Sequence, residues 1–168
     1  MKNQTKNLVL CALFAALVTL STIVIQIPSP MSGYVNLGDV FVLTAAFLLG
    51  PIYGTVAAGV GSMLADVFTG YVIYAPGTLI IKAAMAIVAY VIYAALMKSK
   101  VKQIIAIIVA AIVAELLMVA GYFGYSALII GESWAALASV PGNLIQGAVG
   151  ASLSTVISLM LKRSKFFD

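Results

Sequence analysis

Long apolar segments separated by three short basic clusters are the feature that most restricts how this chain can fold. The clusters are Lys2 and Lys6 near the start, Lys98, Lys100 and Lys102 in the middle, and Lys162, Arg163 and Lys165 near the end. Only 8% of the 168 residues are charged, whereas soluble chains carry about a quarter charged residues. Basic flanks around apolar segments are the usual orientation signal of a membrane protein. The net charge of +4 is therefore interpreted as a membrane signal, and no nucleic-acid partner is expected.

Six apolar segments are expected to form membrane helices. Their spans are about 7–27, 39–50, 52–69, 77–97, 101–125 and 140–161. Pro28 and Pro30 end the first segment, and the helix-stopping pair Gly50-Pro51 separates the second from the third. Segment 39–50 is too short to span alone, since a crossing needs about 20 helical residues. The sequence therefore predicts an all-α membrane protein with six transmembrane helices, in a single domain covering residues 1–168.

The basic clusters also predict the orientation of the chain. An even number of crossings places both termini on one side, together with eight of the nine Lys and Arg residues. By the positive-inside rule that side is the cytoplasm. The three longer loops then face outward and carry Tyr34, Tyr71, Tyr74 and Trp134. These aromatic residues either anchor the protein at the membrane interface or cover a ligand.

Charged and amide side chains interrupt the apolar spans, and all of them belong to the outer half of the membrane. They are Asp39, Asp66, Lys82, Glu115, Asn143 and Gln146. A charge at the centre of a bilayer costs about 2.5–3.5 kcal/mol on insertion scales, so each one needs an explanation. Their one-sided distribution predicts a polar cavity that opens outward and is closed by apolar packing toward the cytoplasm. Such a shape suits the capture of a small molecule better than conduction.

The charged residues also have structural interpretations, which the sequence leaves open. Asp39 can cap the helix that it begins. Asp66 can pair with Lys82, and Lys82 can instead pair with Glu115 as a buried ion pair that fixes helix register. Asn143 and Gln146 are three residues apart and therefore share one helix face.

Several classes of chemistry lack the residues that they need. Histidine is absent and Cys11 is the only cysteine, so no metal site is expected. The chain contains no G-x-x-x-x-G-K-[ST] phosphate loop and is not expected to hydrolyse ATP itself. No pair of a nucleophile and a base is evident. We therefore expect neither an enzyme nor a cofactor bound by this chain.

Four stretches of the chain together resemble the substrate-binding S components of energy-coupling factor (ECF) vitamin transporters. They are Ala12-Leu13-Phe14-Ala15-Ala16, Asn36-Leu37-Gly38-Asp39, Leu49-Gly50-Pro51-Ile52-Tyr53-Gly54 and Ile81-Lys82-Ala83. The family's usual Lys-Gly in the fourth segment is Lys82-Ala83 here. The resemblance implies the six-helix S-component fold and a pocket near the outer surface, formed by the first loop and segments four to six.

The same resemblance implies the partners of the chain. Ala12 and Ala16 would form a coupling surface that docks a membrane scaffold (T) subunit. Two ATPase (A) subunits, which hold ATP and Mg²⁺, would lie below that scaffold. The expected location is the plasma membrane of a prokaryote, with several crossings.

The expected function is substrate capture for an ATP-driven importer of a small water-soluble vitamin or precursor. The chain looks most like the subgroup linked to pyridoxine or hydroxymethylpyrimidine. Tyrosines for stacking, and Glu115, Asn143 and Gln146 for hydroxyl groups and ring nitrogens, would suit such ligands. Pantothenate, riboflavin and a queuosine precursor are alternatives, and a stand-alone secondary transporter is a second alternative. The candidate substrate-binding residues are Tyr34, Asn36, Tyr74, Lys82, Glu115, Tyr122, Asn143 and Gln146.

Overall fold

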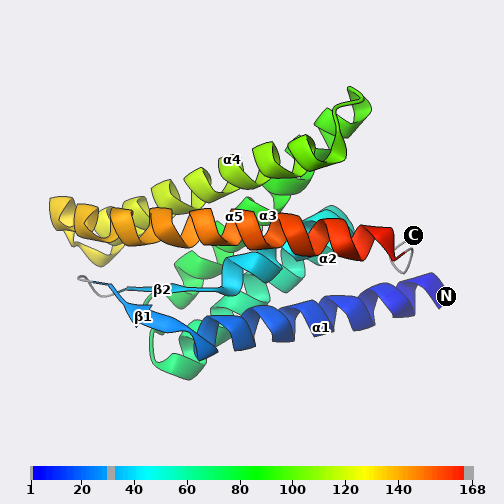
Figure 1. Cartoon of the computed structure of the whole chain (residues 1–168). Coiled ribbons are helices and arrows are strands. Elements are labelled where there is room, and N and C mark those ends of the chain that lie inside the picture. Colours follow the sequence, from blue (N-terminus) through cyan, green and yellow to red (C-terminus); the bar gives the residue numbers. More distant parts are fainter. Residues whose placement is uncertain (1, 30–32, 165–168) are drawn as a thin grey trace.

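Five long helices form the body of the protein in a computed structural model that describes residues 2–29 and 33–164. Each of the five is long and apolar enough to cross a membrane. They pack in the order α1 on α2, α2 on α3, α3 on α4 and α4 on α5, and α5 closes the bundle against α2 (Figure 1). The helices are α1 (Lys2–Val24), α2 (Gly38–Thr69), α3 (Ala75–Lys98), α4 (Gln103–Gly124) and α5 (Val140–Arg163). The expected helical architecture is present, but with five helices in place of the six predicted.

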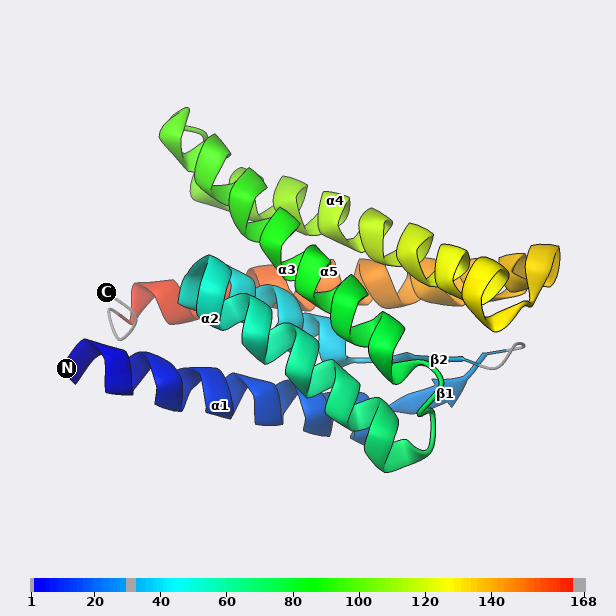
Figure 2. The same cartoon turned by 180° about the vertical axis from the view of Figure 1, so that it is seen from behind.

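The difference in number arises at Gly50-Pro51, where the two expected segments 39–50 and 52–69 form the single element α2. Gly50 leaves helical geometry, with φ 77° and ψ −171°, a conformation that glycine adopts without the steric penalty of a side chain. Pro51 then restarts the helix at once, because its fixed φ suits a first helical position. The two arms of α2 fold back on each other (Figure 2). A Cβ atom on Gly54 would lie only 2.8 Å from the carbonyl oxygen of Ala45.

The two ends of the bundle differ in character. The start of α1, the end of α5, the bend in α2 and the turn between α3 and α4 lie at one end, which we name the terminal end (Figures 1 and 2). The described basic residues outside the core belong to elements and turns of this end. They are Lys6, Lys98, Lys100, Lys102, Lys162 and Arg163. Lys165, from the third predicted cluster, lies outside the described residues, as does Pro30 from the expected end of the first segment.

The opposite end, which we name the hairpin end, contains a structure that the sequence analysis treated as a loop. Strands β1 (Gln26–Pro28) and β2 (Tyr34–Asn36) pair antiparallel, with Gln26 opposite Asn36. Helix α1 therefore ends at Val24, earlier than the predicted Ile27. Two short helical segments complete this end, the π-helical η1 (Tyr125–Ile130) and the 3₁₀-helical η2 (Ser133–Ser139).

Mainly apolar side chains, together with the buried hydroxyl groups of Ser154 and Ser158 on α5, fill the interior from the middle of the bundle toward the terminal end. Leu43, Met85, Ile107 and Met118 are among the largest fully buried side chains and bring α2, α3 and α4 together. Helix α1 approaches α2 closely at Gly61, where a Cβ atom would lie 2.6 Å from the carbonyl oxygen of Ala15. Small residues permit such close approach of helix backbones in a membrane.

Substituting Gly61 with alanine is expected to lower the free energy of unfolding by about 1–3 kcal/mol, because the new methyl group meets backbone atoms that cannot rotate away. Thermal unfolding in detergent micelles measures this change. Gly124→Ala is the matched control, since no atom of the described residues lies within 4 Å of a Cβ atom there. An unchanged unfolding temperature for Gly61→Ala would contradict the close contact between α1 and α2.

Candidate functional site

A polar cavity lies at the hairpin end, beneath β2 and between the ends of α2, α3, α4 and α5. Its volume is about 30 Å³, which is enough for about two water molecules. Six of the eight predicted substrate-binding residues line it. They are Tyr34, Asn36, Tyr74, Tyr122, Asn143 and Gln146. These six residues come from four elements or turns, including the hairpin that the sequence did not predict.

Lys82 and Glu115, the other two predicted substrate-binding residues, are not among the residues that line this cavity. The Lys82 ammonium is buried and forms an ion pair with Asp39. It also lies 5.3 Å from the centroid of the Tyr122 ring, within the range of a cation–π interaction. The two pairings that the sequence left open, Lys82 with Asp66 and Lys82 with Glu115, are therefore not the ion pair that the described structure contains. The sequence offered three acids, and helix packing brings only Asp39 into ion-pair distance.

Asp39 does not cap its helix. The N-cap position is Leu37 and has no side-chain capping hydrogen bond. The Asp39 carboxylate is fully buried and accepts hydrogen bonds from Lys82 and, at 2.5 Å, from Nε2 of Gln146. Its position in the first turn of α2 points it into the bundle, where a cation and an amide compensate the charge.

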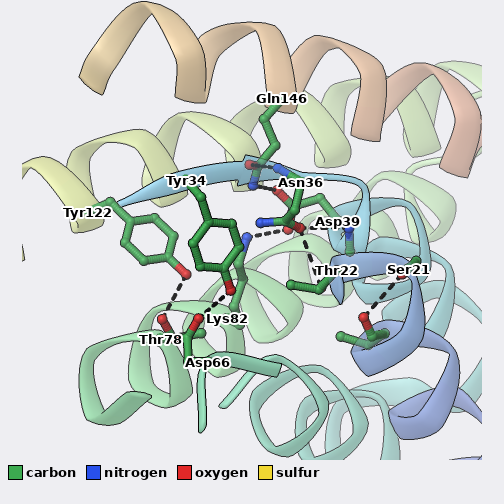
Figure 3. A network of polar contacts seen from close by, with 12 residues as sticks. Ser21, Thr22, Tyr34, Asn36, Asp39, Asp66, Thr78, Lys82, Tyr122 and Gln146 are labelled. Atoms are coloured by element: carbon green, nitrogen blue, oxygen red, sulfur yellow. Dashed lines mark hydrogen bonds and ion pairs between the residues drawn. The ribbon is translucent and has the colours of Figure 1, made fainter. Parts of the chain in front are cut away.

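Gln146 links this buried ion pair to the hairpin (Figure 3). While its Nε2 donates to Asp39, its Oε1 accepts a 2.8 Å hydrogen bond from the backbone N–H of Asn36. The Asn36 side chain in turn accepts a 2.7 Å hydrogen bond from the backbone N–H of Gly38. Strand β2 is thus fastened to α5 and to the start of α2 by two amide side chains.

Glu115 lies beside this network without joining it. Its side chain is 5% exposed, and within residues 2–29 and 33–164 neither carboxyl oxygen has a hydrogen-bond partner. Helix α5 presents Gly147 and Gly150 toward it, since a Cβ atom on either would meet Glu115 side-chain atoms. A buried polar group without a partner costs about 1–3 kcal/mol, and more when it is charged.

Asp66, one of the polar residues that predict the cavity but not one of the eight candidate substrate-binding residues, lines the cavity. Its Oδ1 accepts a hydrogen bond from the Tyr34 hydroxyl (Figure 3), whereas its Oδ2 has no partner in the part of the chain that the structure describes. Burial and the nearby Asp66 charge raise the pKa of the Tyr34 phenol well above its usual value, so the phenol keeps its proton and donates. The charge of Asp66 within an apolar span was the sequence signal, but the contact with Tyr34 could not be predicted because it depends on the hairpin.

The aromatic residues of the outward loops divide into two groups. Tyr34 packs on Tyr71 with ring centroids 4.5 Å apart, and buried Tyr74 bonds Ser126 at 3.1 Å, so these rings enclose the cavity. Burial raises the pKa of Tyr74 as well. Trp134 is 77% exposed, as expected of an interfacial anchor.

Ala12 and Ala16 lie on the opposite side of α1 from its buried residues. Both are exposed, whereas Phe14 and Val18 face the core. The predicted coupling residues thus form a surface of small side chains four residues apart, directed away from the bundle.

The fold and the cavity define a multi-pass membrane protein with a polar site at one end and an apolar interior behind it. The family described as "ECF-type riboflavin transporter, S component" matches residues 2–163. The chain therefore belongs to this family of ECF transporter S components, which are non-catalytic, substrate-binding transporter subunits.

Known proteins similar to this chain include both a sequence relative and solved structures. An uncharacterised protein of Pyrococcus woesei, encoded in a gap 3′ region, is 31% identical over 147 residues, which are 87% of this chain and 95% of that protein. The S component of a bacterial ECF transporter has a TM-score of 0.72 at 22% identity, over 95% of this chain and 97% of its own. The S component for biotin from an ECF-type ABC transporter has a TM-score of 0.75 at 19% identity, over 99% of this chain and 95% of its own. At these identities the two structures show the shared fold.

Proposed function

We propose that this chain captures a small water-soluble vitamin or vitamin precursor outside a prokaryotic cell for an ATP-driven ECF importer. The observation that carries the proposal is the polar cavity at the hairpin end, which is closed toward the terminal end by fully buried apolar side chains such as Met85 and Ile107. A site with one polar end suits capture, because conduction needs polar groups along the whole depth.

The proposed orientation places the terminal end in the cytoplasm. The described basic residues outside the core gather at that end, as the positive-inside rule requires. If the two arms of α2 are counted separately, the chain crosses the membrane region six times, with both termini cytoplasmic. The hairpin and the cavity then face the outside.

The proposed substrate is pyridoxine or hydroxymethylpyrimidine. Tyrosine rings and the amides of Asn36 and Asn143 line the cavity, and such groups can stack on a heterocycle and bind its hydroxyl groups. Riboflavin is a second candidate, favoured by the description of the family that matches this chain.

Substrate entry requires the hairpin to move. Pockets for small molecules have volumes of about 300–1,000 Å³, whereas this cavity has about 30 Å³. The residues that close it from the hairpin include Tyr34 and Asn36, and each is held by hydrogen bonds to helices. Breaking these bonds would release β2 from the ends of α2 and α5.

The proposed partners are a membrane scaffold subunit and two ATPase subunits that hold ATP and Mg²⁺. The exposed surface at Ala12 and Ala16 supports this proposal, since small side chains let a partner helix approach closely.

Mass spectrometry of small molecules released from the purified protein tests the proposed function. We expect a roughly stoichiometric vitamin-like heterocycle, and no uptake into liposomes that contain this chain alone. Uptake by the chain alone would favour a secondary transporter and contradict the proposal.

Asn143→Ala is expected to weaken binding of the released ligand about tenfold, the effect of one lost hydrogen bond of about 1.5 kcal/mol. Isothermal titration in detergent measures the dissociation constant. Asn7→Ala is the matched control, because Asn7 lies in the first turns of α1 at the other end of the bundle. Wild-type affinity in Asn143→Ala would remove this residue from the site.

A further inference from the structure

The cavity is lined by a carboxylate, that of Asp66, in which one oxygen accepts no hydrogen bond of ordinary geometry from the described residues, although the Thr78 hydroxyl lies near the group. Asp66 is 2% exposed and lines the cavity, and its Oδ2 has no hydrogen-bond partner among the described residues. Its other oxygen, Oδ1, accepts from the Tyr34 hydroxyl of the hairpin. Buried polar atoms in native proteins are nearly always paired, so an unpaired one at a cavity wall needs an explanation.

The charges around the cavity give this acceptor a consistent electrostatic setting. None of the side chains that line the cavity is basic within residues 2–29 and 33–164. The nearest buried cation, Lys82, is already compensated by Asp39. Asp66 is the only acid among the described residues that line the cavity, and the Lys82 ammonium that attracts it is shared with the Asp39 carboxylate.

From this geometry we infer that Asp66 determines specificity, by accepting a hydrogen bond from a cationic or N–H donor group of the substrate. The inference rests on the proposed function and narrows its substrate class. Nitrogen heterocycles with a protonated ring nitrogen, an amine or an imide N–H fit this site. Vitamins that carry a carboxylate do not fit, because their charge would lie in the field of Asp66 without a cation to compensate it.

Movement of the hairpin strengthens this role. When Tyr34 leaves with β2, Oδ1 of Asp66 loses its donor, so the carboxylate then offers both oxygens to a ligand. A planar ring with two adjacent donors can satisfy both oxygens at once, as a bidentate partner does. Entry of the substrate thus replaces a bond to the hairpin with bonds to the ligand.

Matched pairs of ligands test the inference on the wild-type protein by isothermal titration in detergent. Pyridoxine and 4-pyridoxate differ by a hydroxymethyl group replaced with a carboxylate, and panthenol and pantothenate differ in the same way. We expect 4-pyridoxate to bind at least about tenfold more weakly than pyridoxine, and pantothenate not to bind. Riboflavin, which has an imide N–H, is titrated in parallel.

Asp66→Asn tests the residue directly, since it keeps the shape and removes the charge. We expect it to weaken binding of whichever heterocycle binds by about 10- to 100-fold, the effect of losing a hydrogen bond to a charged group. Glu132→Gln is the matched control, because Glu132 is an acid of the same end that does not line the cavity. Size-exclusion chromatography checks that the variants fold. If Asp66→Asn does not fold, the ligand pairs on the wild type still decide the question.

Each outcome separates this inference from the proposed function. Wild-type affinity in a folded Asp66→Asn protein would overturn the role of Asp66 and leave vitamin capture intact. Binding of 4-pyridoxate or pantothenate as tight as that of its alcohol would do the same. If no probe binds and no small molecule co-purifies, both the proposed function and the inference fail.

Discussion

Lys82→Met is expected to destabilise the protein by about 3–5 kcal/mol, the largest effect of any single substitution considered. The change leaves the Asp39 carboxylate fully buried without the ammonium that compensates it. Removing one partner of a buried ion pair has a cost of this size, because the remaining charge has neither water nor a counterion. Denaturant titration of both proteins in detergent measures the difference in their free energies of unfolding.

The control for this prediction is a double variant. Asp39→Asn combined with Lys82→Met removes both charges, and the asparagine side-chain oxygen can still accept from Gln146. We expect the double variant to recover most of the lost stability, since apolar or neutral replacements of buried ion pairs are often tolerated. A single variant as stable as the wild type would show that Asp39 does not depend on Lys82.

Ala16→Trp is expected to abolish assembly with the scaffold subunit while binding of the ligand stays within about twofold of wild type. Ala16 is exposed on the outer face of α1, and the cavity lies at the hairpin end of the bundle. An indole there would prevent close approach of a partner helix. Co-purification with the scaffold and ATPase subunits measures assembly, and titration with the released vitamin measures binding.

Ala148→Trp is the matched control for the assembly experiment. Ala148 is also an exposed small residue, but it lies on α5. We expect this variant to assemble normally. Equal assembly of the Ala16 and Ala148 variants would contradict a coupling surface on α1, and Ala12→Trp is expected to behave as Ala16→Trp does.

Helix positions could be predicted from the sequence because apolar length and basic flanks decide them. Segment 77–97 corresponds to α3, Ala75–Lys98, and segment 140–161 to α5, Val140–Arg163. The number of helices was wrong because Gly50-Pro51 stops a helix in most settings. Here Pro51 restarts it directly, and the two arms remain one bent element.

The hairpin could not be predicted because its strands are too short to show a pattern. Each has three residues, and two-residue alternation cannot be recognised over such a length. Its stability comes instead from distant partners, Asp66 on α2 and Gln146 on α5. Long-range contacts of this kind leave no local signal.

The candidate site was predictable at the level of which end of the bundle is polar, but not at the level of pairings. Polar residues in one half of each span indicated a one-ended cavity, and six of the eight chosen residues line it. Sequence spacing could not decide which of Asp39, Asp66 and Glu115 meets Lys82. That choice depends on how far each helix is rotated about its own axis. The small residues of the helices permit several rotations and do not specify one.

The double attachment of Gln146 has a thermodynamic consequence. One amide group bonds both the backbone of β2 and the Asp39 carboxylate. The two hydrogen bonds are therefore coupled, and each changes the stability of the other by the same free energy. Weakening the contact with Asp39 should therefore alter how readily β2 departs. By the same reciprocity, a ligand that displaces β2 should change how well the buried ion pair of Asp39 and Lys82 is protected from water.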